Sequence, residues 1–279
     1  MNGLVWGAII ALIALGLSLV FGLVEIINLA HGEFYMLGAI SSVVVASHWG
    51  GFFAALVVCP IAVAIFGLVA EKLVLRRIER DPSATVIATF GLSMILQYAA
   101  LWYFGGAPRR VPDPWGYLIP LGDNRYAAYR VLVAFISVIC FVGFHLYLQR
   151  SRYGLWIRSV GQDSTLASAL GIPVHRVFWI VFGLGSGFAA LAGVLAAPIF
   201  GVEFRMGTDV LTLAFMAAIV GGLGNFRATF ISGILIGLLE SLLAIPLSPT
   251  VSRVSTLVLI CVALTLRPEG FFTSRDRTA

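Results

Sequence analysis

Residues 150–176 read RSRYGLWIRSVGQDSTLASALGIPVHR and form a polar stretch between two long apolar runs. Asp163 or Ser164 can cap a helix here, because each offers a side-chain oxygen to the free amides of a first turn. Gly171, followed by isoleucine and proline, predicts the end of that helix about two turns later. Such a helix is too short to cross a bilayer. It is either a loop that folds locally or a docking site for another protein.

Composition identifies the chain as a polytopic membrane protein. Hydrophobic residues make up 60% of the 279 positions and charged residues 11%, whereas about 25% of a soluble domain is charged. The net charge of +5 comes from loop arginines and lysines, so it indicates orientation rather than a nucleic-acid partner. Cys59, Cys140 and Cys261 lie far apart within apolar runs, without the spacing of metal ligands. We therefore expect buried cysteines and no metal site.

Apolar runs predict an all-α fold with eight to nine membrane helices in a single domain over residues 1–279. A run of about 20 apolar residues crosses a hydrocarbon core. The first run lacks a cleavable-signal pattern, so we expect it to be retained. The second is short, so it is expected to be tilted, extended into the polar residues that precede it, or discontinuous. The expected elements cover residues 3–24, 34–47, 51–70, 84–104, 131–148, 177–200, 210–226, 228–247 and 254–266.

Positive charges indicate the orientation. If residues 150–176 form a cytoplasmic loop, alternation of the spans leaves six of the 18 lysines and arginines outside and twelve inside. This bias towards the cytoplasm predicts an outer N-terminus and an inner C-terminus. The proline-rich loop 105–129 then faces outward and should be irregular. The six outer cations are Arg109, Arg110, Arg125, Arg130, Arg205 and Arg253.

A cluster of polar side chains follows the first span and consists of Glu25, Asn28, His31 and Glu33. Charged groups at membrane depth are costly and mark substrate or ion paths, which is one interpretation. The other is a solvated turn at the cytoplasmic end of the span. Both interpretations stay open on the residues alone. A metal site has weak support, because one histidine and two carboxylates in a single loop fix no coordination geometry.

Two short segments resemble each other, FGLVE at 21–25 and FGVE at 200–203. The first ends a span on the inside and the second ends one on the outside, as inverted repeats require. We therefore expect the elements that follow them to line a pathway, including the span broken at Gly221, Gly222 and Gly224.

Small residues and one acid complete the intramembrane signals. Gly233 and Gly237, like the small residues spaced along 183–201, predict close helix contacts. Glu240 is a lone acid within the eighth span. It either pairs with an amide or hydroxyl on a neighbouring helix or lines a water-filled route.

The sequence contains no phosphate-binding G-x-x-x-x-G-K-[ST] loop, no H-E-x-x-H motif and no Ser/His/Asp arrangement. We therefore expect neither an enzyme nor a bound cofactor. Any transport by this chain needs an energy source outside the sequence.

Residues 16–39 read GLSLVFGLVEIINLAHGEFYMLGA, and residues 153–174 read YGLWIRSVGQDSTLASALGIPV. The first stretch resembles the N-terminal signature of LivH-type permeases of bacterial ABC importers for branched-chain amino acids. The second is similar to the cytoplasmic loop with which these permeases dock on an ATPase. Residues 221–225, GGLGN, resemble a further family segment, although Asn225 replaces the usual serine.

The resemblance implies a multi-pass permease subunit of the bacterial inner membrane that carries branched-chain or related amino acids. It also implies two ABC ATPase subunits, a homologous LivM-type permease and an external substrate-binding protein docked on residues 105–129 and 201–209. Membrane lipid surrounds the chain, and no nucleic acid is expected. The short helix becomes the ATPase-coupling site, with Asp163, Ser164, Thr165, Leu166, Ala167, Ala169, Leu170 and Gly171. Pathway candidates are Asn28, His31, Glu33, Gly221, Gly222, Gly224 and Glu240.

Two alternatives remain. A proton-coupled secondary transporter of small organic solutes would use Glu25, His31, Glu33 or Glu240 as its relay and would need no ATPase. A structural subunit would need no polar pathway at all.

Overall fold

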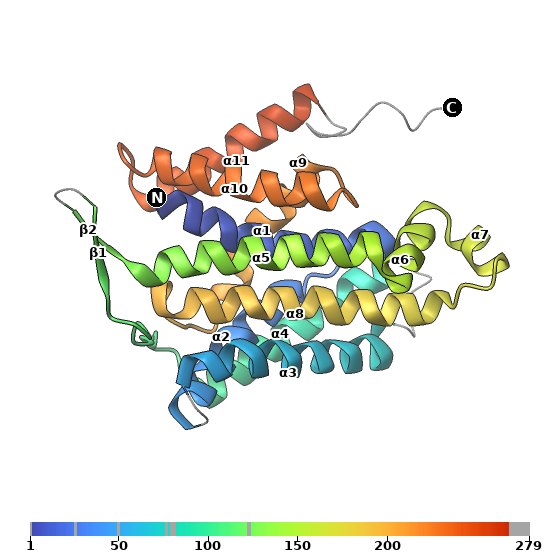
Figure 1. The fold of residues 1–279 in the computed structure, drawn as a ribbon, viewed down its shortest axis with the longest axis horizontal. Helices are drawn as coiled ribbons and strands as arrows, with labels where there is room; N and C mark the ends of the chain where they lie inside the picture. The colour runs from blue at the N-terminus through green and yellow to red at the C-terminus, as the bar shows by residue number, and fades with distance from the viewer. Residues whose placement is uncertain are drawn as a thin grey trace.

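The computed structural model describes residues 2–24, 27–48, 51–75, 78, 82–121 and 124–267. These residues form eleven helices and one two-stranded hairpin (Figure 1). The strands are β1 (Leu118–Leu121) and β2 (Asn124–Ala127). The helices are α1 (Asn2–Val24), α2 (His31–His48), α3 (Gly51–Leu73), α4 (Pro82–Phe104), α5 (Ala128–Arg150), α6 (Arg152–Gln162), α7 (Ser164–Ala169), α8 (Val174–Phe200), α9 (Met206–Gly221), α10 (Phe226–Leu243) and α11 (Pro249–Leu266).

The predicted all-α membrane fold is confirmed. Seven of the helices in the described residues are long and apolar enough to cross a membrane, namely α1, α3, α4, α5, α8, α10 and α11. Helix α9 is apolar but has only 16 residues. Helix α2 has 18 residues with Glu33 in its first turn. These nine helices correspond one to one with the nine elements expected from the apolar runs.

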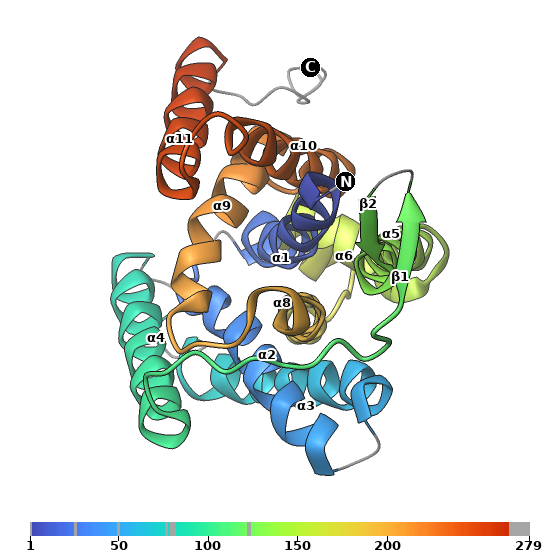
Figure 2. The same cartoon turned by 90° about the vertical axis from the view of Figure 1, so that its left-hand side faces the viewer.

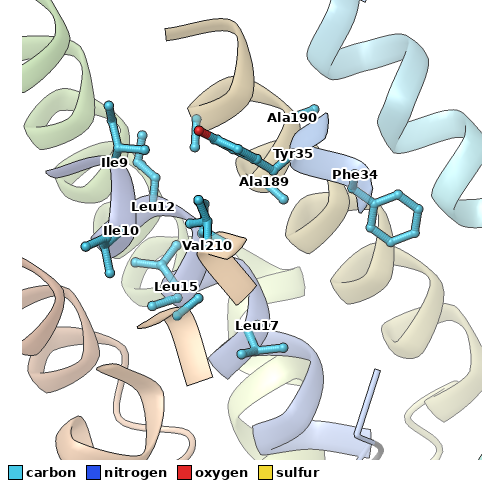
Figure 3. Close-up of a cluster of buried hydrophobic side chains, with 14 of the residues drawn as sticks. Ile9, Ile10, Leu12, Leu15, Leu17, Phe34, Tyr35, Ala189, Ala190 and Val210 are labelled. Carbon is cyan, nitrogen blue, oxygen red and sulfur yellow. The ribbon is translucent and has the colours of Figure 1, made fainter. Parts of the chain in front are cut away.

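Helices α1 and α8 form the centre of the bundle, and Figure 2 shows the other helices around them. They run antiparallel, because Trp6 packs on Phe200 at one end and Gly16 contacts Gly185 further along. Buried side chains of α1, α2, α8 and α9 meet in one core, part of which is drawn in Figure 3. By contrast, α3, α4, α5 and α11 expose many apolar side chains, as helices in contact with lipid do.

The contacts between elements repeat in an inverted arrangement. Helix α1 packs on α9 and α10, and α8 packs in the same way on α2 and α3. The two repeats are α1–α3 and α8–α10. Their second helices, α2 and α9, meet at Gly32 and Gly207, where each glycine faces the other's backbone carbonyl. Close approach of this kind requires glycine on both sides. These paired contacts support the inverted repeat that the two FG segments suggested.

The two ends of the bundle differ (Figure 1). The start of α1 and the β hairpin lie at one end, and α6 and α7 lie at the other. This separation agrees with the predicted opposite placement of the N-terminus and residues 150–176. Several residues used in the sequence argument lie outside the described residues, namely Glu25, Arg76, Arg77, Arg80, Arg275 and Arg277.

The expectation that residues 105–129 are irregular was wrong for the second half of that loop. Strands β1 and β2 pair in antiparallel register from Leu118 with Ala127 to Leu121 with Asn124. A Gly-Asp pair between two short runs with β-forming residues is a hairpin signal in the sequence. An isolated bridge also joins this loop to the end of α8, since the backbones of Arg109 and Val202 exchange hydrogen bonds of 2.9 and 2.8 Å.

Candidate functional site

Helix α7 begins and ends where the sequence predicts. The Asp163 carboxylate, rather than Ser164, caps it by accepting hydrogen bonds from the amides of Thr165 and Leu166 at 2.8 and 2.9 Å. Gly171 has a φ of +83°, which an L side chain rarely adopts. Its amide donates to Ser168, and the next amide donates to the carbonyl of Ala167. This is the Schellman arrangement, which satisfies the last carbonyls of a helix.

The exposed side chains of α7 differ from the expected set at one position. Leu166 and Leu170 are 59% and 74% exposed, and they lie on one side of the helix because they are four residues apart. Ala167 is only 2% exposed and belongs to the buried core. Its expected place on a docking face was therefore wrong. The other expected coupling residues, Asp163, Ser164, Thr165, Ala169 and Gly171, are exposed.

Helix α6 was missed by the sequence argument. It begins after Ser151, whose hydroxyl accepts a hydrogen bond from the Gly154 amide at 2.8 Å. Its buried side, which includes Ile157 and Val160, packs on α5, α8 and α1. The serine cap was a signal that could have revealed it. Because α6 contacts α7 on one side and the central helices on the other, it joins the exposed leucines to the centre of the bundle.

A cavity of about 620 Å³ lies beside α6 at the same end of the bundle. It is bordered by the end of α1 and by the Gly-rich connection between α9 and α10. There a β carbon added to Gly22 would lie 2.6 Å from the Cα of Gly224. Gly222 and Gly224 both have positive φ angles, and the Gly224 amide donates to the Ser18 hydroxyl at 3.3 Å. Three predicted pathway residues thus lie in a closely packed connection near α6, the glycine joint, which consists of Gly221, Gly222 and Gly224.

The polar cluster after α1 lies inside the bundle. Asn28, His31 and Glu33 are buried, and the His31 Nε2 atom lies 3.2 Å from the carbonyl oxygen of Ile13. Ile13 lies halfway along α1, so residues 27–30 return into the bundle and α2 begins within it. A solvated turn at the cytoplasmic end of α1 is therefore excluded for these three residues. The second element is one unbroken helix that begins at His31, so it extends into the polar cluster rather than being discontinuous.

Glu33 lies where α2, α4 and α9 meet. Its Oε1 atom accepts hydrogen bonds from Ser93 at 2.9 Å, from Gln97 at 2.7 Å and from Thr208 at 3.4 Å. The other carboxylate oxygen has no partner within the described part of the chain, and neither do the Nδ2 atom of Asn28 and the Nδ1 atom of His31. Buried polar atoms without partners are costly, so such a group is a candidate for binding water or a solute. No motif or spacing indicates that Thr208 belongs to this cluster.

Glu240 lies near the hairpin end of the bundle, away from this cluster. Its carboxylate accepts a hydrogen bond from the Trp6 indole at 2.7 Å and forms an ion pair with Arg253 at 3.3 Å. The Ser252 hydroxyl donates to its backbone carbonyl at 2.6 Å. The interpretation of Glu240 as a paired acid is therefore supported, with an indole and a guanidinium as the partners.

The predicted pathway residues thus occupy three levels of the bundle. Glu240 lies near the hairpin end, the Glu33 cluster near the middle, and the glycine joint near α6. Among the described residues, no three histidine, cysteine or acidic side chains gather as a metal site would require.

Comparisons with known proteins point to one family. The family described as the permease component of branched-chain amino acid transport systems matches residues 1–264. The high-affinity branched-chain amino acid transport system permease protein LivH of Escherichia coli (strain K12) is 29% identical, over 96% of this chain and 92% of its own length. LivH of Salmonella typhimurium is 28% identical over the same shares. The corresponding permease protein BraD of Pseudomonas aeruginosa is 28% identical over 96% and 93%. No solved structure matches the chain.

Proposed function

The chain belongs to the family of permease components of branched-chain amino acid transport systems, and from this premise we propose that it is the membrane subunit of an ABC importer. It is a transport protein rather than an enzyme. We place it in the bacterial inner membrane as one domain over residues 1–279. The loop 150–176 faces the cytoplasm and the loop 105–129 faces outward.

The observation that carries this proposal is the geometry of α7. A six-residue helix, capped at both ends, presents Leu166 and Leu170 to solvent at one end of the bundle. Exposed leucines on a short helix are costly in water and suit a groove in a partner protein. An ATPase subunit that holds α7 can move α6 with it. The movement then reaches the central helices through the contacts of α6 with α1 and α8.

The proposed complex contains further subunits. Permeases of this kind work with ATPases and a substrate-binding protein. We assign two ATPase subunits and one homologous LivM-type permease to it. The binding protein docks at the outer end, on the loop 105–129 and on residues 201–209. The bridge between Arg109 and Val202 holds these two segments together as one surface.

The proposed cargo is a branched-chain amino acid, which is the substrate class given in the names of the relatives. We assign Asn28, His31 and Glu33 to the middle of the pathway. Glu33 is suited to the ammonium group of an amino acid, because one of its oxygens has no protein partner. The glycine joint at Gly221, Gly222 and Gly224 lies at the inner end, and Glu240 lies at the outer end.

A buried carboxylate between neutral donors also supports a second function, proton-coupled transport with Glu33 as the relay. Purification in mild detergent separates the two functions. The ABC proposal predicts that ATP-binding subunits co-purify with the parent chain and are lost from Leu166→Arg. The matched control is Leu118→Arg, an exposed leucine at the opposite end. If no ATPase accompanies the parent under conditions that preserve a known importer complex, the ABC proposal fails.

A further inference from the structure

A second cavity, of about 560 Å³, opens at the end of the bundle opposite α7. It lies between the start of α1, the end of α8, the start of α9, and the connection from α10 to α11. Its size is in the range of small-molecule sites. It also borders Tyr35, two residues after Glu33 on α2, so it lies close to the buried polar cluster.

Two arginines border this cavity, namely Arg130, which donates to the Asn2 side chain, and Arg253, which is held in place by groups that face it. Glu240 is paired with Arg253, and the second oxygen of Glu240 is engaged by the Trp6 indole. Both carboxylate oxygens are therefore engaged. Arg253 uses only its Nε atom in this pair, and its side chain is 42% exposed. The guanidinium thus keeps N–H donors for an anionic group, and a fixed guanidinium binds a carboxylate well.

Two acids without a side-chain partner in the described ranges border the same cavity, Glu203 and Asp209. Asp209, in the first turn of α9, forms no side-chain hydrogen bond or ion pair in the described ranges of the chain. It can therefore receive an ammonium group.

Part of the remaining wall is aliphatic. Val5 of α1, Ile199 of α8, and Met206 and Val210 of α9 contribute to it. Figure 3 shows Val210 among the side chains of α1, with Tyr35 extending from α2 towards the same helix. A guanidinium with free donors, carboxylates without partners and an aliphatic surface match the three parts of an amino acid with an apolar side chain.

We propose that this cavity is a receiving site for a free α-amino acid with an aliphatic side chain. Arg253 binds the carboxylate, Asp209 binds the ammonium group, and the aliphatic wall packs on the side chain. The inference rests on the proposed function, which makes this end the one where substrate arrives. Glu240 is a positioning residue that orients Arg253 and does not contact the ligand.

The test measures binding of L-leucine to the purified permease complex, without the substrate-binding protein, by saturation-transfer NMR of the leucine methyl groups. We expect the dissociation constant to rise about tenfold in Arg253→Gln and in Asp209→Asn, because each removes one charge-assisted contact. Arg253→Lys keeps the charge and should lose less. Arg267→Gln removes an exposed arginine outside the cavity and serves as the control.

Two analogues test the assignment of the charges. The compound 3-methylbutylamine lacks the carboxylate, and 4-methylpentanoate lacks the ammonium group. In the parent both should bind more weakly than leucine. Arg253→Gln should weaken leucine but leave the amine unchanged, and Asp209→Asn should weaken leucine but leave the acid unchanged. If one of the two charge-removing variants fails to fold, the other still decides the question.

The proposal is overturned if the charge-removing variants that fold bind leucine like the parent, or if the parent gives no signal at saturating leucine. These failures differ from failure of the proposed function. An importer that lacks this site still co-purifies with its ATPase but shows no binding at the cavity. A chain without an ATPase partner fails the pull-down whatever its leucine affinity.

Discussion

Gly16 of α1 and Gly185 of α8 contact each other reciprocally at the centre of the bundle. A β carbon added to Gly16 would lie 2.5 Å from the carbonyl oxygen of Gly185, and one added to Gly185 would lie 2.8 Å from that of Gly16. Each distance is too short for a real contact, so both positions require glycine. The two antiparallel helices at the core of the inverted repeat are thus held at backbone contact distance by this pair.

Gly16→Val should therefore destabilise the protein. The two helices must separate, and overpacking of this kind costs about 1–3 kcal/mol. Thermal denaturation in detergent measures the loss. Gly143→Val in α5 is the control, because a β carbon there meets no atom within 4 Å. Equal melting temperatures for the two variants would contradict the packing argument.

Substitutions at neighbouring positions of α7 should have different effects. Leu166→Arg should leave the amount of folded protein unchanged, because the side chain is exposed. It should abolish ATP-dependent uptake, because it places a charge on the proposed ATPase-docking face. Ala167→Glu should lower the amount of folded protein, because it places a charge in a buried position. Size-exclusion chromatography and uptake into reconstituted vesicles measure the two quantities. Loss of folding in Leu166→Arg would count against an exposed docking face.

The left-handed backbone at Gly171 gives a matched pair of variants. Asn tolerates positive φ better than other residues with side chains, whereas a β-branched residue is strained there. Gly171→Val should therefore weaken recovery of the ATPase more than Gly171→Asn does. No atom lies within 4 Å of an added β carbon, so the difference reports the backbone alone. Equal recovery from both variants would mean that the end of α7 does not matter for docking.

Glu33→Gln should slow transport while preserving the fold, since glutamine keeps the size of the side chain and its hydrogen bonds to Ser93 and Thr208. Charged hydrogen bonds contribute about 1.5–3 kcal/mol each, so removing the charge should reduce uptake by roughly tenfold or more.

The energy source of uptake is determined with the unsubstituted protein. Uptake into vesicles with a constant supply of ATP should persist when an uncoupler removes the proton gradient. Collapse of uptake under that condition would favour the proton-coupled alternative and assign Glu33 to the relay.

Local signals allowed the sequence to predict much of the fold. Apolar runs predict nine membrane elements, and the caps Asp163 and Gly171 predict α7, because each depends on neighbouring residues alone. The burial of Ala167 does not follow from the spacing. Ala167 lies three residues before Leu170, so a helix places the two as neighbours, and only the packing of α7 on α6 and α8 decides that Ala167 is covered.

Contacts between distant segments set the rest of the site. The Glu33 cluster depends on Ser93 and Thr208, which lie on helices far away in sequence. Nothing in residues 25–33 says that the chain turns back towards Ile13. One partner of Glu240 is equally distant, since Trp6 comes from the first helix. Such pairings follow from how the helices pack, and the pattern of a single segment does not contain them.

The bridge between Arg109 and Val202 has a consequence for protein engineering. Because the two segments exchange backbone hydrogen bonds, neither can be transplanted into a relative without leaving the other with unpaired groups. A chimera designed to accept a foreign binding protein should therefore replace residues 105–129 and 201–209 together. Exchange of one segment alone would join two surfaces that do not match.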